Sequence, residues 1–204
     1  MSEKPGCLPL WSRIIIGLVI AAFSGTMIFA SKCVFDIKEL ARLAVDPAYI
    51  AMCAGKIADF PEPLPEGYSY KVGLDLQPFQ ISIVTLEHAA DQQQMVFFSV
   101  RDQTPDVDAK SLLSRAYDYG INTPTASAHF TDLKMKGEIT VAGETAPYMS
   151  GQLTDREGRK YEGLIACIRP KGQKKTILIY ALEPPGKPLN TDICFDLLKK
   201  IKKI

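Results

Sequence analysis

The apolar pattern of the chain begins with one long, uninterrupted run near the amino terminus. Residues 14–30, from Ile14 to Ala30, carry no charge, and their only polar side chains are Ser24 and Thr26. At 1.5 Å per residue, a helix of this length spans roughly 26 Å, close to the bilayer hydrocarbon thickness of about 30 Å. The run therefore predicts a transmembrane helix that holds the chain in a lipid bilayer.

This run could be a cleaved signal peptide, a lipoprotein signal or an uncleaved signal anchor. Its apolar core is longer than that of the usual signal peptide, and Ile28 stands where a small residue is preferred before a cut after Ala30. Lipoprotein processing requires a small residue directly before the modified cysteine, whereas Lys32 precedes Cys33. We therefore expect an uncleaved anchor that follows a short cytoplasmic tail of residues 1–13.

The side of the membrane is inferred from the lengths of the two flanking segments. Lysine and arginine residues are nearly balanced close to the run, with Lys4 and Arg13 before it and Lys32, Lys38 and Arg42 after it. Long domains translocate largely regardless of their charge. Because more than 150 residues follow the run, we expect the domain on the extracytoplasmic side, either periplasmic or extracellular.

Helical periodicity continues beyond the anchor. Apolar residues at helical spacing predict an amphipathic stem, namely Val34, Ile37, Ala41 and Ala44. Asp46 then supplies an N-cap, and Pro47 occupies the first position of a second helix. One stripe of that helix could dock on the domain: Ile50, Cys53, Ala54 and Ile57. Three prolines within residues 60–67 favour an extended passage, so residues 31–66 are assigned to a helical stem and proline-rich linker.

Residues 67–204 alternate between strand and helix patterns. The sequence predicts strands over 68–76, 79–86 and 95–100, and then a helix that begins at the capping residues 104–108 and ends at Gly120. Residues 121–131 are interpreted as a loop. Four further strands are predicted over 134–141, 145–154, 160–169 and 174–182. Short hairpin links imply an antiparallel sheet of about six to seven strands covered by helices, which is an α+β fold.

A closing helix is predicted at the carboxyl end of the chain. Asn190 or Thr191 caps it, and its apolar residues share one face: Ile193, Leu197, Leu198, Ile201 and Ile204. That face is expected to pack across the strands 160–169 and 174–182. Four lysines lie off this face, namely Lys199, Lys200, Lys202 and Lys203. They are explained by the helix dipole and by solubility, and contact with an anionic lipid surface is the alternative.

The order of these elements resembles that of the PsbP-like family, an α/β/α sandwich with many secreted and membrane-tethered members. The resemblance covers residues 65–204 and includes a Pro-x-Gly-aromatic entry (Pro65, Gly67 and Tyr68) and the closing helix. It implies a non-enzymatic binding or assembly role. It carries no functional residue over to this chain.

Composition limits the candidate chemistry. The formal net charge is +1 and the chain has 47% hydrophobic residues, so nothing in the balance favours nucleic acid as a partner and one folded core is expected. Four of the five cysteines follow the anchor, which leaves one or two disulfides open. The stronger interpretation is that they are small buried hydrophobic residues. We expect Cys167 and Cys194 to lie close together in the core.

Two functions from different classes remain. The first is a single-pass, membrane-anchored extracytoplasmic binding or assembly-accessory domain, with the bilayer and a protein on the sheet face as partners and with no cofactor or metal. The second is a membrane-tethered hydrolase acting on an envelope substrate, with candidate residues Glu87, His88, Asp91 and His129. No Gly-x-Ser-x-Gly or phosphate-binding glycine motif occurs in the sequence. Candidate residues more than about 10 Å apart would argue against the hydrolase.

The anchor leads to a prediction about processing. We expect the mature protein to retain residues 1–30 and to stay with membranes after a carbonate wash, since an uncleaved apolar helix of this length remains in the bilayer. External protease should digest the domain and spare the tail. Recovery of a soluble form that begins at Ser31 would overturn this prediction.

Overall fold

The computed structural model describes residues 42–101, 107–119, 121–122, 127–155 and 157–204. The predicted transmembrane run and the predicted stem up to residue 41 lie outside these ranges, whereas the second helix and the proline-rich linker lie within them. Within them, none of the helices combines the length and the apolar character that crossing a bilayer requires.

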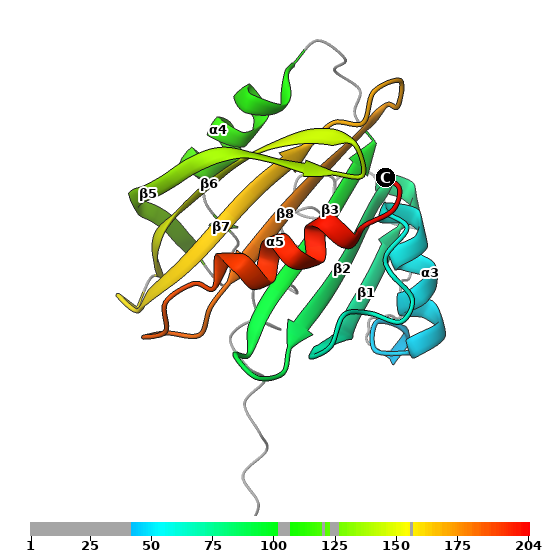
Figure 1. The fold of residues 1–204 in the computed structure, drawn as a ribbon, viewed down its shortest axis with the longest axis horizontal. Coiled ribbons are helices and arrows are strands. Elements are labelled where there is room, and N and C mark those ends of the chain that lie inside the picture. Colours follow the sequence, from blue (N-terminus) through cyan, green and yellow to red (C-terminus); the bar gives the residue numbers. More distant parts are fainter. Residues whose placement is uncertain (1–41, 102–106, 120, 123–126, 156) are drawn as a thin grey trace, which may run out of the picture.

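One antiparallel sheet forms the body of the described chain, and its strands follow the spatial order β1, β2, β3, β8, β7, β6, β5, β4 (Figure 1). The expected α+β class with an antiparallel sheet is therefore confirmed. Of the eight strands, β4 has only two residues. The strands are β1 (Tyr68–Leu76), β2 (Ile81–His88), β3 (Gln93–Arg101), β4 (Ile121–Asn122), β5 (Ser127–Val141), β6 (Glu144–Asp155), β7 (Lys160–Ile168) and β8 (Lys175–Leu182).

The sheet consists of two meanders that meet in its middle. Strands β1 to β3 form the first meander, and β4 to β8 form the second. The two join where β3 pairs with β8, in a register that runs from Gln94 opposite Leu182 to Arg101 opposite Lys175. The chain passes from β3 to β4 through α4 (Ala109–Tyr119), which begins where Asp108 accepts a hydrogen bond from the Ser111 amide at 2.8 Å.

The prediction of a loop over residues 121–131 is wrong. Residues Ile121–Asn122 form β4, and β5 begins at Ser127 rather than near residue 134. The pairing of β5 with β6 shifts register twice, between Phe130 and Asp132 and between Leu133 and Met135. Each bulge interrupts the period-two alternation by which a strand is recognised, so this part of β5 has no strand pattern in its sequence.

Two helices cover one face of the sheet. Figure 1 shows α5 (Thr191–Lys200) crossing this face, and α3 (Pro47–Ile57) packs against β1 and β2. The caps are as predicted: Asp46 accepts from the Tyr49 amide at 2.9 Å, and Asn190 accepts from the Ile193 amide at 3.4 Å. The buried residues of α3 are those of the predicted stripe: Ile50, Cys53, Ala54 and Ile57.

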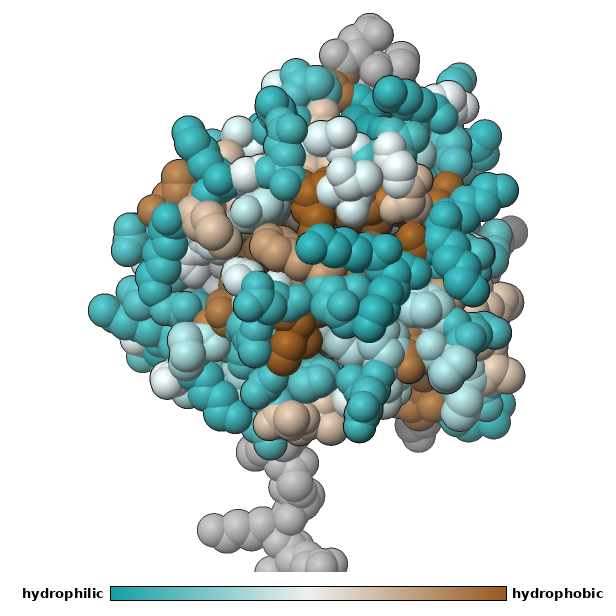
Figure 2. All heavy atoms as spheres, viewed as in Figure 1, coloured by the Kyte–Doolittle hydropathy of each residue, from teal (hydrophilic) through white to brown (hydrophobic). Residues whose placement is uncertain are grey.

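The closing helix packs as predicted, but it ends before Ile201 and Ile204, which were expected to belong to it. Cys194, Leu197 and Leu198 share one apolar cluster with residues of β7 and β8, including Leu164 and Ile179. The helix ends at Lys200, and Ile201 is buried beyond it as the C-cap. Figure 2 shows that the outer surface on this side is largely hydrophilic, with apolar side chains visible only in small, separate areas. On this side, the described residues therefore form no large apolar patch of the kind that marks a protein interface.

Helix α4 packs on the opposite face of the sheet. Leu113 of α4 clusters with Ile165 and Cys167 of β7, whereas Leu164 and Ala166 join the cluster under α3 and α5. This division follows from the alternation of side chains along a strand. It also corrects one expectation: Cys167 and Cys194 are both buried, but they lie on opposite faces of the sheet.

The outer edge of β1 is closed by the chain that leads into α3. The Gly73 amide donates to the Ala44 carbonyl at 2.9 Å, and the Asp75 amide donates to the Tyr49 hydroxyl at 3.3 Å. A β-carbon at Gly73 would lie 2.8 Å from the Ile50 Cα, so this close approach depends on glycine. These two bonds satisfy donors that an open edge would offer to another chain.

Burial of α5 leads to a stability prediction. Leu197 is 0% exposed, so Leu197→Ala should lower the free energy of unfolding by about 2–5 kcal/mol. Lys200 is exposed and pairs with Asp196, one turn earlier, at 2.6 Å. The control Lys200→Ala should therefore cost less than about 0.5 kcal/mol. Urea denaturation measures both changes, and equal stabilities would show that α5 lies outside the core.

Candidate functional site

At one end of the strands, polar side chains take the place of the apolar core. Val84 of β2 and Phe97 of β3 belong to the cluster under α3 and α5. Two positions farther along the same face, each strand carries a serine, because side chains on one face recur at every second residue. Ser82 is paired with Asp75 of β1 on one side and with Ser99 of β3 on the other. These three residues form a polar row across the sheet.

The next row toward the strand ends is cationic. Arg101 of β3 lies directly opposite Lys175 of β8, and by the same alternation Arg101 shares the face of Ser99. Like charges directly opposite each other on neighbouring strands destabilise a sheet. This row therefore favours a negative charge beside it.

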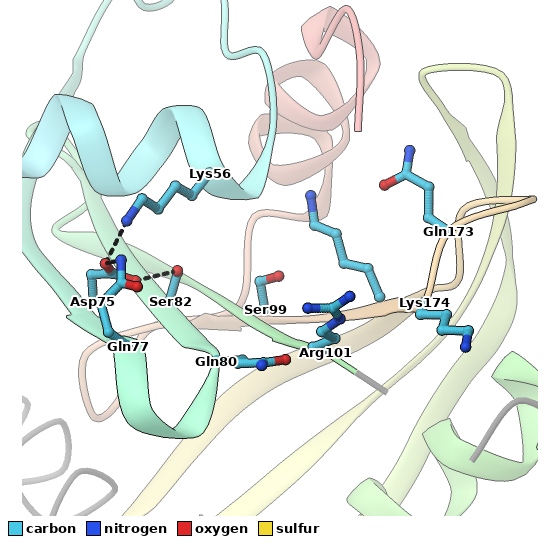
Figure 3. Close-up of a pocket in the computed structure, with 10 residues that line it drawn as sticks. Lys56, Asp75, Gln77, Gln80, Ser82, Ser99, Arg101, Gln173 and Lys174 are labelled. Atoms are coloured by element: carbon cyan, nitrogen blue, oxygen red, sulfur yellow. Dashed lines mark hydrogen bonds and ion pairs between the residues drawn. The ribbon is translucent and has the colours of Figure 1, made fainter. Parts of the chain in front are cut away.

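Both rows line a cavity of about 660 Å³ next to the end of α3 (Figure 3). Four of the lining residues are cationic (Lys56, Arg101, Lys174 and Lys175), Asp75 is the one acid, and the others are serines and glutamines. In Figure 3, Arg101, Ser99 and Gln80 lie between the Lys56–Asp75 pair on one side and Gln173 and Lys174 on the other. The cavity thus collects an excess of positive charge.

Asp75 is the centre of a hydrogen-bonded network at one side of the cavity. Its carboxylate accepts from Lys56 Nζ at 2.5 Å, from Gln77 Nε2 at 2.6 Å and from Ser82 Oγ at 2.9 Å. Burial alone would raise the pKa of the Asp75 carboxyl, but the three hydrogen bonds together hold that pKa below its usual value. The ion pair also joins α3 to β1, and it compensates the charge of Lys56.

Lys175 is held differently. Its Nζ donates to the carbonyl of Ile57, the last residue of α3, at 2.6 Å. Burial lowers the pKa of the Lys175 ammonium group, because removal from water disfavours the charged form. Within the described residues the ammonium makes no ion pair with a carboxylate. Lys175 is thus a half-buried cation whose charge is balanced only by a carbonyl dipole.

The backbone beside the cavity is strained at Gln80. The short helix η1 (Gln77–Phe79) ends at Gln80, which adopts φ 53° and ψ 42°, in the left-handed region. A residue with a β-carbon pays roughly 1–2 kcal/mol there. Two backbone hydrogen bonds hold the turn, from the Gln80 amide to the Gln77 carbonyl and from the Arg101 amide to the Gln80 carbonyl. Such strain concentrates at functional sites.

A second cavity of about 380 Å³ lies beside the start of α5. Glu183 lines it, is 1% exposed and accepts from the Asn190 amide at 3.5 Å. Burial raises the pKa of the Glu183 carboxyl. Among the described residues, no group of histidine, cysteine, aspartate and glutamate side chains could hold a metal ion. The buried Glu183 carboxyl is explained by the hydrogen bond that it accepts at the start of α5.

The candidate hydrolase residues do not converge. His88 Nδ1 lies 3.2 Å from Asp91 Oδ2, whereas the Glu87 carboxylate pairs with Lys71 at 3.1 Å. Glu87 and His88 are consecutive residues of β2, so their side chains point to opposite faces of the sheet. His129 lies on β5, and four strands separate β5 from β2. At about 4.8 Å per strand spacing, the two histidine backbones are roughly 24 Å apart.

The imidazole of His88 is packed against the start of β1. Its ring centroid lies 5.1 Å from that of Tyr68. A β-carbon at Gly67 would come within 2.5 Å of His88 Nε2, so the glycine backbone lies directly against the ring. This packing gives His88 a structural explanation.

The buried thiols of Cys53 and Cys194 are poor nucleophiles. Burial raises the pKa of Cys53 to about 11 and that of Cys194 to about 12. The thiolate is the reactive form of cysteine, and these environments keep it scarce.

The four lysines proposed for lipid contact lie at the end of α5 and just beyond it. Lys199, Lys200, Lys202 and Lys203 are all exposed. The Lys203 carbonyl accepts from the Asp59 amide at 2.7 Å, so the segment after α5 is attached to the chain that follows α3. Contact of these lysines with lipid stays a prediction.

No pattern in the sequence predicts the basic cavity. Its one available signal was a polar residue at the inward position of a strand, as at Asp75, Ser82 and Ser99. Each of these is unremarkable alone, because a strand end often carries a polar residue. Only the register of β1, β2, β3 and β8 shows that they adjoin.

Comparisons with known proteins do not assign a family. Neither the protein-family models nor the curated proteins contain a match to this chain.

The Asp75 network leads to a prediction about acid stability. Because the pKa of Asp75 is lower in the folded protein than in the unfolded chain, its ionised carboxylate stabilises the fold. This stabilisation is complete above the unfolded-state pKa of about 3.9, and it is lost as the pH falls through the folded-state pKa. Asp75→Asn should therefore be less stable than wild type at neutral pH, and it should lose less stability below about pH 4. Urea midpoints across pH measure this. The exposed Asp118→Asn is the matched control, and parallel curves for Asp75→Asn and wild type would contradict the prediction.

Proposed function

We propose that this chain is a single-pass, membrane-anchored protein whose extracytoplasmic α+β domain binds an anionic ligand in the basic cavity. The anchor is inferred from the apolar run of residues 14–30, and the side of the membrane from the folded domain of more than 100 residues that follows it. The class of ligand is inferred from the cavity. Binding, rather than catalysis, is the role that the described residues support.

The observation that carries the proposal is the cross-strand pair of Arg101 and Lys175. Two cations held side by side on a sheet repel each other, and an anion between them removes the repulsion. Arginine offers a planar fork of donors that matches a carboxylate or phosphate group, and lysine adds a point charge. Because Lys56 is already paired with Asp75, the uncompensated charge lies at Arg101, Lys174 and Lys175.

An assembly-accessory role remains part of the proposal. Binding of a protein partner to a sheet face has less support than binding of a ligand in the cavity, because α3 and α5 cover much of one face and α4 packs on the other. An anionic ligand bound beside the end of α3 would contact both α3 and the strand ends. Ligand binding could then regulate how the domain meets another envelope component.

Anion binding to the full chain in a zwitterionic detergent tests the proposal. Isothermal titration with phosphate, sulfate and citrate, at constant ionic strength, should show saturable binding. Arg101→Gln should weaken it about 10- to 100-fold, because a hydrogen bond to a charged group contributes about 1.5–3 kcal/mol.

The matched control is Arg115→Gln, which removes the same charge from an exposed position on α4. It should leave the affinity unchanged. Equal weakening by both variants would reduce the effect to net charge, and the absence of binding to any of the three anions would refute the proposal.

A further inference from the structure

We infer that the basic cavity is built for a small hydroxylated organic anion, of the class of phosphorylated or carboxylated sugars. This inference rests on the proposed function, and it adds that the ligand has two chemically different ends. The anionic group lies at the Arg101–Lys175 row, and the hydroxyl groups lie at the polar row that contains Ser82 and Ser99.

The two ends of the ligand correspond to two parts of the cavity. Around Asp75, the charges of Lys56 and the carboxylate already compensate each other, so this part attracts no further ion. Across the sheet, Arg101 and Lys175 lie opposite each other without a carboxylate partner among the described residues. A ligand with one anionic end and one neutral polar end matches this division of charge.

The polar part of the cavity can recognise hydroxyl groups. The amides of Gln77 and Gln80 each carry donors and an acceptor, although one Gln77 donor is used by Asp75. The Ser99 hydroxyl can act as donor or acceptor, whereas the Ser82 hydroxyl donates to Asp75 and can accept from a ligand. Ser82 and Ser99 are 8% and 7% exposed, so little of either residue is open to bulk solvent. A sugar hydroxyl also donates and accepts, so it can satisfy such groups in both directions. A bare phosphate ion can chiefly accept, and would use only half of this capacity.

The lining excludes other common organic anions. None of the residues that the described chain contributes to the cavity wall is aromatic or aliphatic. A nucleotide base usually stacks on an aromatic side chain, and an acyl chain needs an apolar wall. The ligand is therefore polar along its whole length.

The size of the cavity also argues for more than an inorganic ion. Its volume is about 660 Å³, whereas a water molecule occupies about 30 Å³ in the liquid. Cavities of about 300–1,000 Å³ are typical of sites for small organic ligands. A single phosphate group would leave most of the space to solvent.

A phosphorylated polyol could come from a free sugar phosphate or from a lipid headgroup. Glucose 6-phosphate represents the first source, and inositol 1-phosphate, the soluble part of a headgroup, represents the second. Both share the chemistry that the cavity recognises. The ratio of their affinities distinguishes the two sources.

The experiment is a set of titrations of the full chain in a zwitterionic detergent with these two probes, glucuronate, inorganic phosphate and glucose. We expect at least one of the three hydroxylated anions to bind about tenfold more tightly than inorganic phosphate, and glucose to bind too weakly to measure. Ser82→Ala should weaken binding of that anion about 3- to 10-fold while leaving inorganic phosphate unchanged. Arg101→Gln should weaken both, and the exposed Ser114→Ala on α4 is the control.

The outcomes separate this inference from the proposed function. If inorganic phosphate binds as tightly as every hydroxylated anion, the domain still binds anions but the inference is overturned. Ser99→Ala is a second variant that leaves the Asp75 network intact, and the inference is also overturned if Ser82→Ala and Ser99→Ala each weaken all ligands equally. If no anion binds, the proposed function fails together with the inference.

Discussion

The pairing of β3 with β8 is the interaction on which both the fold and the candidate site depend. It joins two meanders into one sheet, and without it β3 and β8 would each be an open edge. The same register places Arg101 opposite Lys175 at the end of the ladder. Main-chain hydrogen bonds that build a continuous core thus also hold two cations together, and the shared register explains why the cavity lies at this end of the sheet.

The residues of the apolar core and those that line the candidate site occupy different parts of the sheet. The core under α3 and α5 fills the middle of one face, and α4 packs on the other. Toward the strand ends, the same face changes from apolar residues to serines and then to cations. Because the end of α3 meets this polar part, the Lys56–Asp75 pair and the bond from Lys175 to Ile57 attach the helix without filling the space beside Arg101.

Local patterns predicted the elements whose formation depends on neighbouring residues. Asp46 and Asn190 cap their helices, the stripe from Ile50 to Ile57 is buried, and the sheet is antiparallel, all as expected. The failures occurred where distant pairing decides the outcome. Two bulges gave β5 no strand pattern. Cys167 and Cys194 were expected to adjoin because both sequences are apolar, yet apolar neighbours do not specify which face of a sheet a residue occupies.

The amino-acid sequence alone shows the apolar run of residues 14–30 and the absence of Gly-x-Ser-x-Gly and phosphate-binding glycine motifs, and it predicts the helix caps and a strand-rich domain. These depend on short-range periodicity and on residue type, which the chain displays directly. Only the tertiary structure decided which strands are neighbours, and therefore that Asp75, Ser82, Ser99, Arg101 and Lys175 line one cavity. Register is a relation between segments distant in the sequence, and a shift of one residue would turn each of these side chains to the opposite face.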